Sequence, residues 1–253
     1  MQNHTTSNFT INNHTKVMKL TFMAMMVALG VIISPILRVE GMCPMAHLIN
    51  VTCAVFIGPY YGFLTALIIS ILRMSFLGIP PLAITGQVFG VFLAGMLYRL
   101  SHGKLIWAFL GEVIGTGIIG AIISYPVMTY IWGRTGLTWF FYVPSFIAGT
   151  LIGGSLGFIL LSKMQKAGLV AKFQAALGST VYNGIDSYAN DAIGIAAFGF
   201  IGYLLVLVII HNFIPNPTPA MNAMKYVVLF GCFLGGAVYY LKHKTTGRKS
   251  ITA

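Results

Sequence analysis

Long apolar runs, separated by short polar or basic segments, dominate this chain. Most of them reach the roughly 18–20 residues that a helix needs to cross a bilayer. The pattern therefore predicts an all-α polytopic membrane protein with eight spans, of which the second is short. The expected spans are residues 17–37, 48–57, 60–77, 82–98, 105–131, 140–161, 192–213 and 221–241.

The segments between the spans divide the chain into four parts. Residues 1–16 are polar and rich in Asn and Thr, so we expect a disordered tail. Residues 17–163 hold the first six spans. Residues 164–191 carry apolar side chains at helical spacing beside lysines, which predicts an amphipathic linker helix at the membrane surface. Residues 192–253 form a two-span extension with a basic tail.

Composition excludes a soluble domain. The chain is 57% hydrophobic and 8% charged, whereas soluble domains carry about 25% charged residues. A net charge of +11 would suggest nucleic acid for a soluble protein. Here the basic residues lie at span ends, so we expect no nucleic-acid partner. They instead contact the headgroups of the lipid bilayer and set the topology.

The distribution of basic residues predicts that both termini are cytosolic. With eight spans, 11 of the 15 lysines and arginines fall on the side that holds both ends of the chain, and four fall on the other side. The loop after the first span then faces outward.

Catalytic signatures are missing from the sequence. It contains no Walker A, HExxH or GxSxG motif, so the chain is not expected to hydrolyse ATP or to be an enzyme. With only four acidic residues, a paired-carboxylate site is hard to build. The three cysteines form no CxxC pair, and we expect no metal site and no cofactor.

The stretch 38–59 is the strongest candidate for a site. It places Glu40, His47 and Asn50 between two long apolar runs. Polar groups beside a hydrocarbon layer are costly and by default mark a functional site. Gly41 and Pro44 end the preceding helix and allow the chain to turn back into the membrane.

Other polar residues within the spans extend this candidate site. Arg73 lies about four residues from the outer end of its span, where it either snorkels to the surface or serves as a ligand group or partner of Glu40. Tyr125 precedes Pro126, a kink that would make room for a ligand. For Glu112, a structural hydrogen bond among neighbouring glycines is favoured. The predicted pocket consists of Glu40, His47, Asn50, Arg73, Gln87 and Tyr125.

Rows of small residues predict close helix packing. Gly149, Gly153 and Gly157 lie one turn apart, as do Gly231 and Gly235, and the favoured interpretation of most such rows is packing within the molecule. Ala24 and Ala28 in the first span form a similar pair, which is equally suited to docking on a partner.

Three motifs resemble the ThiW family: GMCPMAHLINVTCAVFIGPYYG, then ILRMSFLG, then GEVIGTGIIGAIISYP. Members are substrate-binding S components of energy-coupling-factor vitamin transporters. The resemblance covers residues 18–163 and implies a six-helix S-component bundle with an outward-facing pocket. It also implies hydroxyethylthiazole, the thiazole moiety of thiamine, as substrate. A transmembrane T component and two cytosolic ATPases are the implied partners, and Ala24 and Ala28 match the alanine motif that docks on the T component.

The resulting hypothesis is a component that binds a thiamine precursor and delivers it to an ATP-driven module. Two alternatives stay open on the residues alone. One is a membrane-embedded enzyme with Glu40, His47 and Arg73 in its site, and the other is a stand-alone secondary transporter for a small metabolite.

Overall fold

The computed structural model describes residues 3–38, 41–182 and 188–249, and these residues form helices without strands. Within this described part of the chain, seven helices are long and apolar enough to cross a membrane, and the short helix α2 (Pro44–Phe56) lies between the first two of them. The all-α polytopic prediction is confirmed. The other spans are α1 (Asn3–Ile33), α3 (Gly58–Leu77), α4 (Leu82–Thr85) with α5 (Val88–Leu100), α6 (Leu105–Ile114) through η2 (Val127–Ile131), α8 (Val143–Lys166), α10 (Tyr188–Phe213) and α11 (Pro219–Lys249).

The polar N-terminal segment differs from expectation. Residues 3–16 continue α1 as helix, where the sequence predicted a disordered tail. Once an apolar span is helical, extending it requires no new nucleation, so polar residues of modest propensity can be added to its end.

Helix α2 lies at the centre of the bundle and contacts α1, α3, α5, α6 and α8. Nearly all of its residues are buried. At about 1.5 Å per residue it is about 20 Å long, too short to cross a bilayer by itself. Since it is surrounded by protein, its polar residues face other helices instead of lipid.

Glycines bring α8 against α2, as the spacing of small residues predicts. A Cβ atom at Gly153 would overlap the carbonyl oxygen of Pro44, and one at Gly157 would lie 3.4 Å from Val51. The row at Gly231 and Gly235 behaves differently, because no atom lies within 4 Å of a Cβ built at either position. That row packs against no helix within the described part of the chain.

The span from α6 to η2 is an uninterrupted helix of mixed type. It widens into π-helical turns at η1 (Gly115–Gly120) and again at η2, directly after the short α7 (Ala121–Pro126). Pro126 lacks an N–H group and therefore cannot make the usual helical hydrogen bond. A widened turn lets the helix continue without that bond. The sequence predicted a kink at Tyr125-Pro126, and the structure has a change of helix type there.

The segment expected as an amphipathic linker contains α9 (Leu169–Ala176). Its buried Gln174 donates hydrogen bonds to the carbonyl oxygen of Val55 at 2.9 Å and to the hydroxyl of Tyr98 at 3.1 Å. Phe173 packs on Phe56, with ring centroids 5.5 Å apart. Helix α9 therefore covers the end of the short α2 and belongs to the packed bundle.

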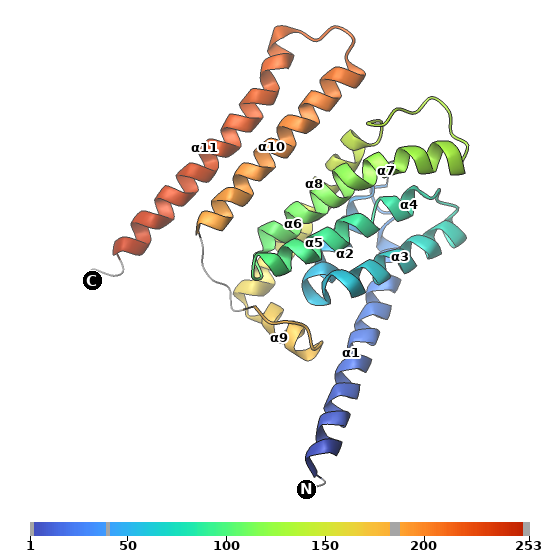
Figure 1. Ribbon diagram of the computed structural model, residues 1–253, viewed down its shortest axis with the longest axis vertical. Coiled ribbons are helices and arrows are strands. Elements are labelled where there is room, and N and C mark those ends of the chain that lie inside the picture. The colour runs from blue at the N-terminus through green and yellow to red at the C-terminus, as the bar shows by residue number, and fades with distance from the viewer. Residues whose placement is uncertain (1–2, 39–40, 183–187, 250–253) are drawn as a thin grey trace.

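Helices α10 and α11 form a hairpin beside the bundle, on the side away from α1 (Figure 1). It contacts α6 and α8 through α10, where the rings of Phe198 and Phe109 lie 4.7 Å apart. An ion pair between Lys104 and Asp191, at 3.2 Å, joins the two parts. Helix α1 begins at the bottom of the view in Figure 1, and α11 ends at its left, at about mid-height.

Candidate functional site

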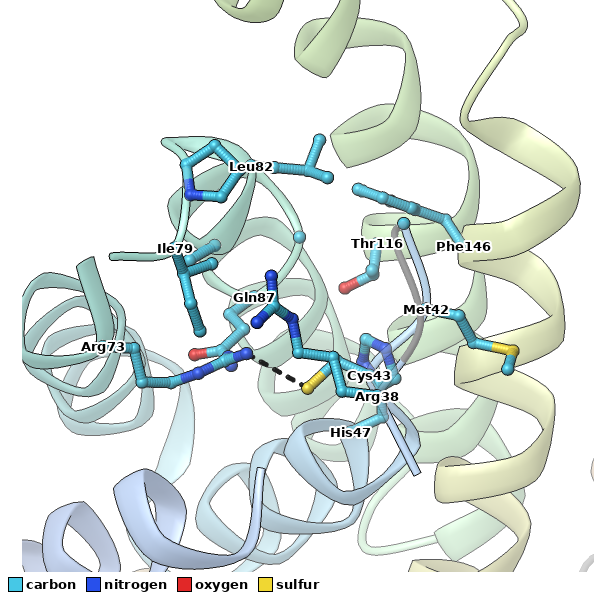
Figure 2. Close-up of a pocket in the computed structure, with 14 residues that line it drawn as sticks. Arg38, Met42, Cys43, His47, Arg73, Ile79, Leu82, Gln87, Thr116 and Phe146 are labelled. Atoms are coloured by element: carbon cyan, nitrogen blue, oxygen red, sulfur yellow. Dashed lines mark hydrogen bonds between the residues drawn. The ribbon is translucent and has the colours of Figure 1, made fainter. Parts of the chain in front are cut away.

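A cavity opens at the end of the bundle where α1 ends and α2 begins. The cavity and its open mouth together comprise about 470 Å³ of empty space. Its walls come from the loop before α2, the end of α3, the α4–α5 break and α8 (Figure 2). The lining residues are Arg38, Gly41, Met42, Cys43, His47, Arg73, Ile79, Pro80, Leu82, Ala83, Gly86, Gln87, Thr116 and Phe146.

Below this cavity, three side chains converge on one carboxylate oxygen. Glu112 is fully buried, and its Oε1 lies 2.8 Å from Nδ1 of His47 and 2.9 Å from Nδ2 of Asn50. Thr116, one turn further along the same helix, donates its hydroxyl to the same oxygen at 3.2 Å. The cluster joins α2 to the α6 span.

A second polar group lies on the α3 side of the cavity. Arg73 donates a hydrogen bond to the thiol sulfur of Cys43 at 3.2 Å, and that thiol donates to the carbonyl oxygen of Ser34 at 2.8 Å (Figure 2). The hydroxyl of Ser70 lies 2.9 Å from the carbonyl oxygen of Ala83 and 3.0 Å from Oε1 of Gln87, and its single proton is shared among the acceptors around it. Arg73 is only 2% exposed, so it points into the bundle and does not snorkel to the surface.

The structure brings together four of the six predicted pocket residues. His47, Arg73 and Gln87 line the cavity, and Asn50 lies behind His47 on Glu112. Tyr125 is not part of the lining, and its ring instead packs against Trp139 with centroids 4.6 Å apart. Glu40 lies outside the described residues.

The family model for the thiamine-precursor transporter protein ThiW matches residues 20–167, more than half of the chain. The chain belongs to the ThiW family. No curated protein and no solved structure matches it. The ThiW match ends with α8, and every residue that lines the cavity falls within it. Helices α9, α10 and α11 lie beyond the match.

Several residues in and behind this cavity were not predicted as part of the site. Cys43, Thr116 and Phe146 line the cavity, and Glu112 holds His47 and Asn50 from behind. Glu112 and Thr116 did carry a signal, since a spacing of four residues places both on one face of a helix. Cys43 and Phe146 carried none, because an isolated Cys or Phe among apolar residues looks like ordinary core.

The described lining of the cavity carries more basic than acidic side chains. It includes Arg38 and Arg73, and no Asp or Glu. The nearest described carboxylate in the hydrogen-bonded network is Glu112, which lies behind His47. Among the described residues no group of three or more His, Cys, Asp or Glu is placed to hold a metal ion.

The predicted docking pair lies on the outer face of α1. Ala24 and Ala28 are both exposed, while Met23 and Met26 on the other side of the same helix are buried. The α10–α11 hairpin is on the far side of the bundle, so it leaves this face uncovered (Figure 1).

Proposed function

We propose that this chain is the substrate-binding component of an ATP-driven uptake system for hydroxyethylthiazole, the thiazole moiety of thiamine. The observation that carries the proposal is the cavity above Glu112, whose polar groups converge on one space within an otherwise apolar bundle. Small-molecule sites typically combine apolar walls with a few placed polar groups. This cavity has that composition, since His47, Arg73 and Gln87 share its lining with the apolar Ile79, Leu82 and Phe146.

The size of the ligand is compatible with tight binding. Hydroxyethylthiazole has about nine non-hydrogen atoms, which sets a ceiling of about −13 kcal/mol at about −1.5 kcal/mol per atom. Nanomolar affinity corresponds to about −12 kcal/mol, so it is physically attainable in a site of this kind. Leu82, Ile79 and Phe146 supply apolar surface for the ring.

The charge of the lining favours the thiazole over intact thiamine. Hydroxyethylthiazole is neutral at physiological pH, whereas thiamine carries a permanent positive charge on its thiazolium ring. Arg38 and Arg73 line the cavity, and their positive charges repel a cation but not a neutral ligand. The site is therefore expected to prefer the neutral precursor.

Energy for uptake would come from partners. The chain contains no Walker A motif, so ATP hydrolysis requires separate ATPase subunits. The exposed Ala24 and Ala28 allow a helix of a transmembrane T component to approach α1 closely. Cytosolic termini, as the charge distribution predicts, would place the basic end of the bundle toward the ATPases.

In this proposal the parts of the chain have different roles. We assign residues 17–163 as the six-span binding unit, with residues 164–191 as its connection to the extension and 192–253 as the extension itself. Helix α9 stabilises the binding unit by covering the end of α2, and none of the described residues that line the cavity belongs to the α10–α11 hairpin.

Titration calorimetry on the purified protein tests the proposal. We expect hydroxyethylthiazole to bind, thiamine to bind at least tenfold more weakly, and the pyrimidine precursor of thiamine to bind weakly or not at all. Recovery of the thiazole unchanged after prolonged incubation would separate binding from catalysis. If none of the three compounds binds, or thiamine binds best, the proposed substrate is wrong.

A further inference from the structure

Glu112 has the features of a group that is built in for a purpose beyond packing. Its carboxylate is fully buried in a membrane span, where an apolar side chain of similar size would be cheaper to accommodate. Space for it is created across the interface by Gly90 on α5. A Cβ atom at Gly90 would overlap the hydroxyl oxygen of Thr116 and would lie 2.6 Å from Oε2 of Glu112.

The neighbours of Asn50 fix the direction of the hydrogen bonds. Its amide nitrogen lies 2.9 Å from Oε1 of Glu112 and 3.1 Å from the carbonyl oxygen of Gln87. Both of these oxygens are acceptors, so the nitrogen of the amide, and not its oxygen, faces them. Oε1 of Glu112 therefore accepts hydrogen bonds from Asn50 and Thr116.

The same oxygen determines which nitrogen of His47 carries a proton. Because Oε1 accepts, Nδ1 of His47 donates to it across 2.8 Å. When the imidazole carries only that one proton, Nε2 is an acceptor. His47 lines the cavity, and Nε2 lies on its α8 side, 3.3 Å from the position of a Cβ atom at Gly149.

We propose that Glu112 is a positioning residue for ligand recognition: it holds His47 so that Nε2 accepts a hydrogen bond from a hydroxyl group of the ligand. The inference rests on the proposed function, and it defines the ligand more narrowly. The site then takes a neutral heterocycle that carries a hydroxyl donor on a short side chain.

The opposite wall supplies the complementary groups. Nε2 of Gln87 and Nε of Arg73 are buried and have no hydrogen-bond partner among the described residues. Both atoms are donors, and both residues line the cavity. A ring nitrogen of the ligand satisfies one of them while the ligand hydroxyl donates to His47. This places the hydroxyl at the α2 and α8 side and the ring nitrogen toward α3 and α5.

A pair of matched ligands tests the proposal. The first is hydroxyethylthiazole, and the second is the analogue in which an ethyl group replaces the hydroxyethyl group. Loss of one ligand hydrogen bond to a buried acceptor corresponds to about tenfold in affinity. By calorimetry on the full-length protein we expect the hydroxyl compound to bind about tenfold more tightly than the ethyl compound.

Substitutions at Glu112 should act selectively on that preference. Glu112→Leu removes the acceptor, so it should weaken the hydroxyl compound about tenfold and change the affinity for the ethyl compound by less than about threefold. Glu112→Gln keeps an amide oxygen that His47 can donate to, and it should retain most of the preference. Ser124→Ala serves as the control, because it removes a buried polar group on the same span but outside the cavity. It should leave the preference for the hydroxyl compound intact.

Nitrogen NMR of histidine-labelled wild-type protein provides a measurement that needs no folded Glu112 variant. The signals of His47, identified by their loss in His47→Asn, should show a proton on Nδ1. The hydroxyl compound, and not the ethyl compound, should shift the Nε2 signal. Equal affinity of the wild-type protein for the two compounds, or a proton on Nε2, would overturn this inference and leave the proposed function standing. If neither compound binds, both fail.

Discussion

The side chains of His47 and Glu112 meet at 2.8 Å, although 65 positions separate them in the sequence. His47 comes from α2, a helix too short to cross the bilayer, and Glu112 comes from the long span that begins with α6. Their contact fixes the depth of α2 within the bundle at a point directly below the cavity. The loop before α2 forms one wall of the cavity. Because the contact between His47 and Glu112 holds α2 in the core, it also holds that wall in place.

Close packing of α8 on α2 leads to the first prediction. Gly153→Ala should destabilise the protein by about 1–3 kcal/mol, because the new Cβ would overlap the carbonyl oxygen of Pro44. Gly231→Ala is the matched control, since the same methyl group meets open space there and alanine favours helix. Thermal unfolding of the detergent-solubilised protein should show a lower midpoint for Gly153→Ala alone. Equal midpoints for the two variants would contradict the packing of α8 on α2.

Docking through α1 gives the second prediction. Replacing both Ala24 and Ala28 by leucine should abolish copurification with the T component and its ATPases, because bulky side chains prevent close helix contact. Calorimetry should find the affinity for hydroxyethylthiazole unchanged, since neither residue lines the cavity. Ala237→Leu, at an exposed position of α11, is the control and should copurify normally. Undiminished recovery of partners with the double variant would rule out this face of α1.

Membrane orientation gives the third prediction. A cysteine introduced at the exposed Thr135, in the loop before α8, should react with an impermeant maleimide applied to intact cells. A cysteine at the exposed Lys172 on α9 should react only after the membrane is opened. The parent chain, with its three free cysteines, gives the background. The reverse pattern would mean that the termini face outward and that the cavity faces the cytosol.

The contact between α9 and α2 gives the fourth prediction. Gln174→Leu should lower stability by about 1–3 kcal/mol, because it removes the donor to Val55 and Tyr98 in a buried position. Gln165→Leu, at an exposed position near the end of α8, should have little effect. The midpoint of thermal unfolding, followed by tryptophan fluorescence, is the measurement. If Gln174→Leu unfolds at the wild-type midpoint, α9 does not stabilise the bundle.

Much of the architecture is readable from the sequence because it depends on local physics. Apolar runs must match the thickness of a bilayer, so the spans could be located from hydropathy alone, including the short second one. The glycine row on α8 predicted close packing because a missing side chain is a property of the residue itself. The motifs around residues 41–62, 71–78 and 111–126 were sufficient to indicate the family that the match to residues 20–167 shows.

The content of the site could be predicted only in part. His47, Asn50, Arg73 and Gln87 stood out because a polar side chain within an apolar run is costly unless it has a partner or a ligand. Tyr125 was misplaced because a sequence gives the spacing along a helix but not its rotation about the axis, and the structure turns this ring onto Trp139. The interior direction of Arg73 likewise depends on Cys43, which is 30 positions away.

The sequence by itself thus determined which segments enter the membrane, which of them pack closely, and to which family the chain belongs. The tertiary structure alone decided that Glu112, and not only the residues of the first loop, lies at the centre of the polar network. The physical reason is that a buried carboxylate acquires its role from donors that three-dimensional packing brings to it. Those donors come from α2 as well as from its own helix, and no local pattern specifies that α2 and α6 meet at this depth.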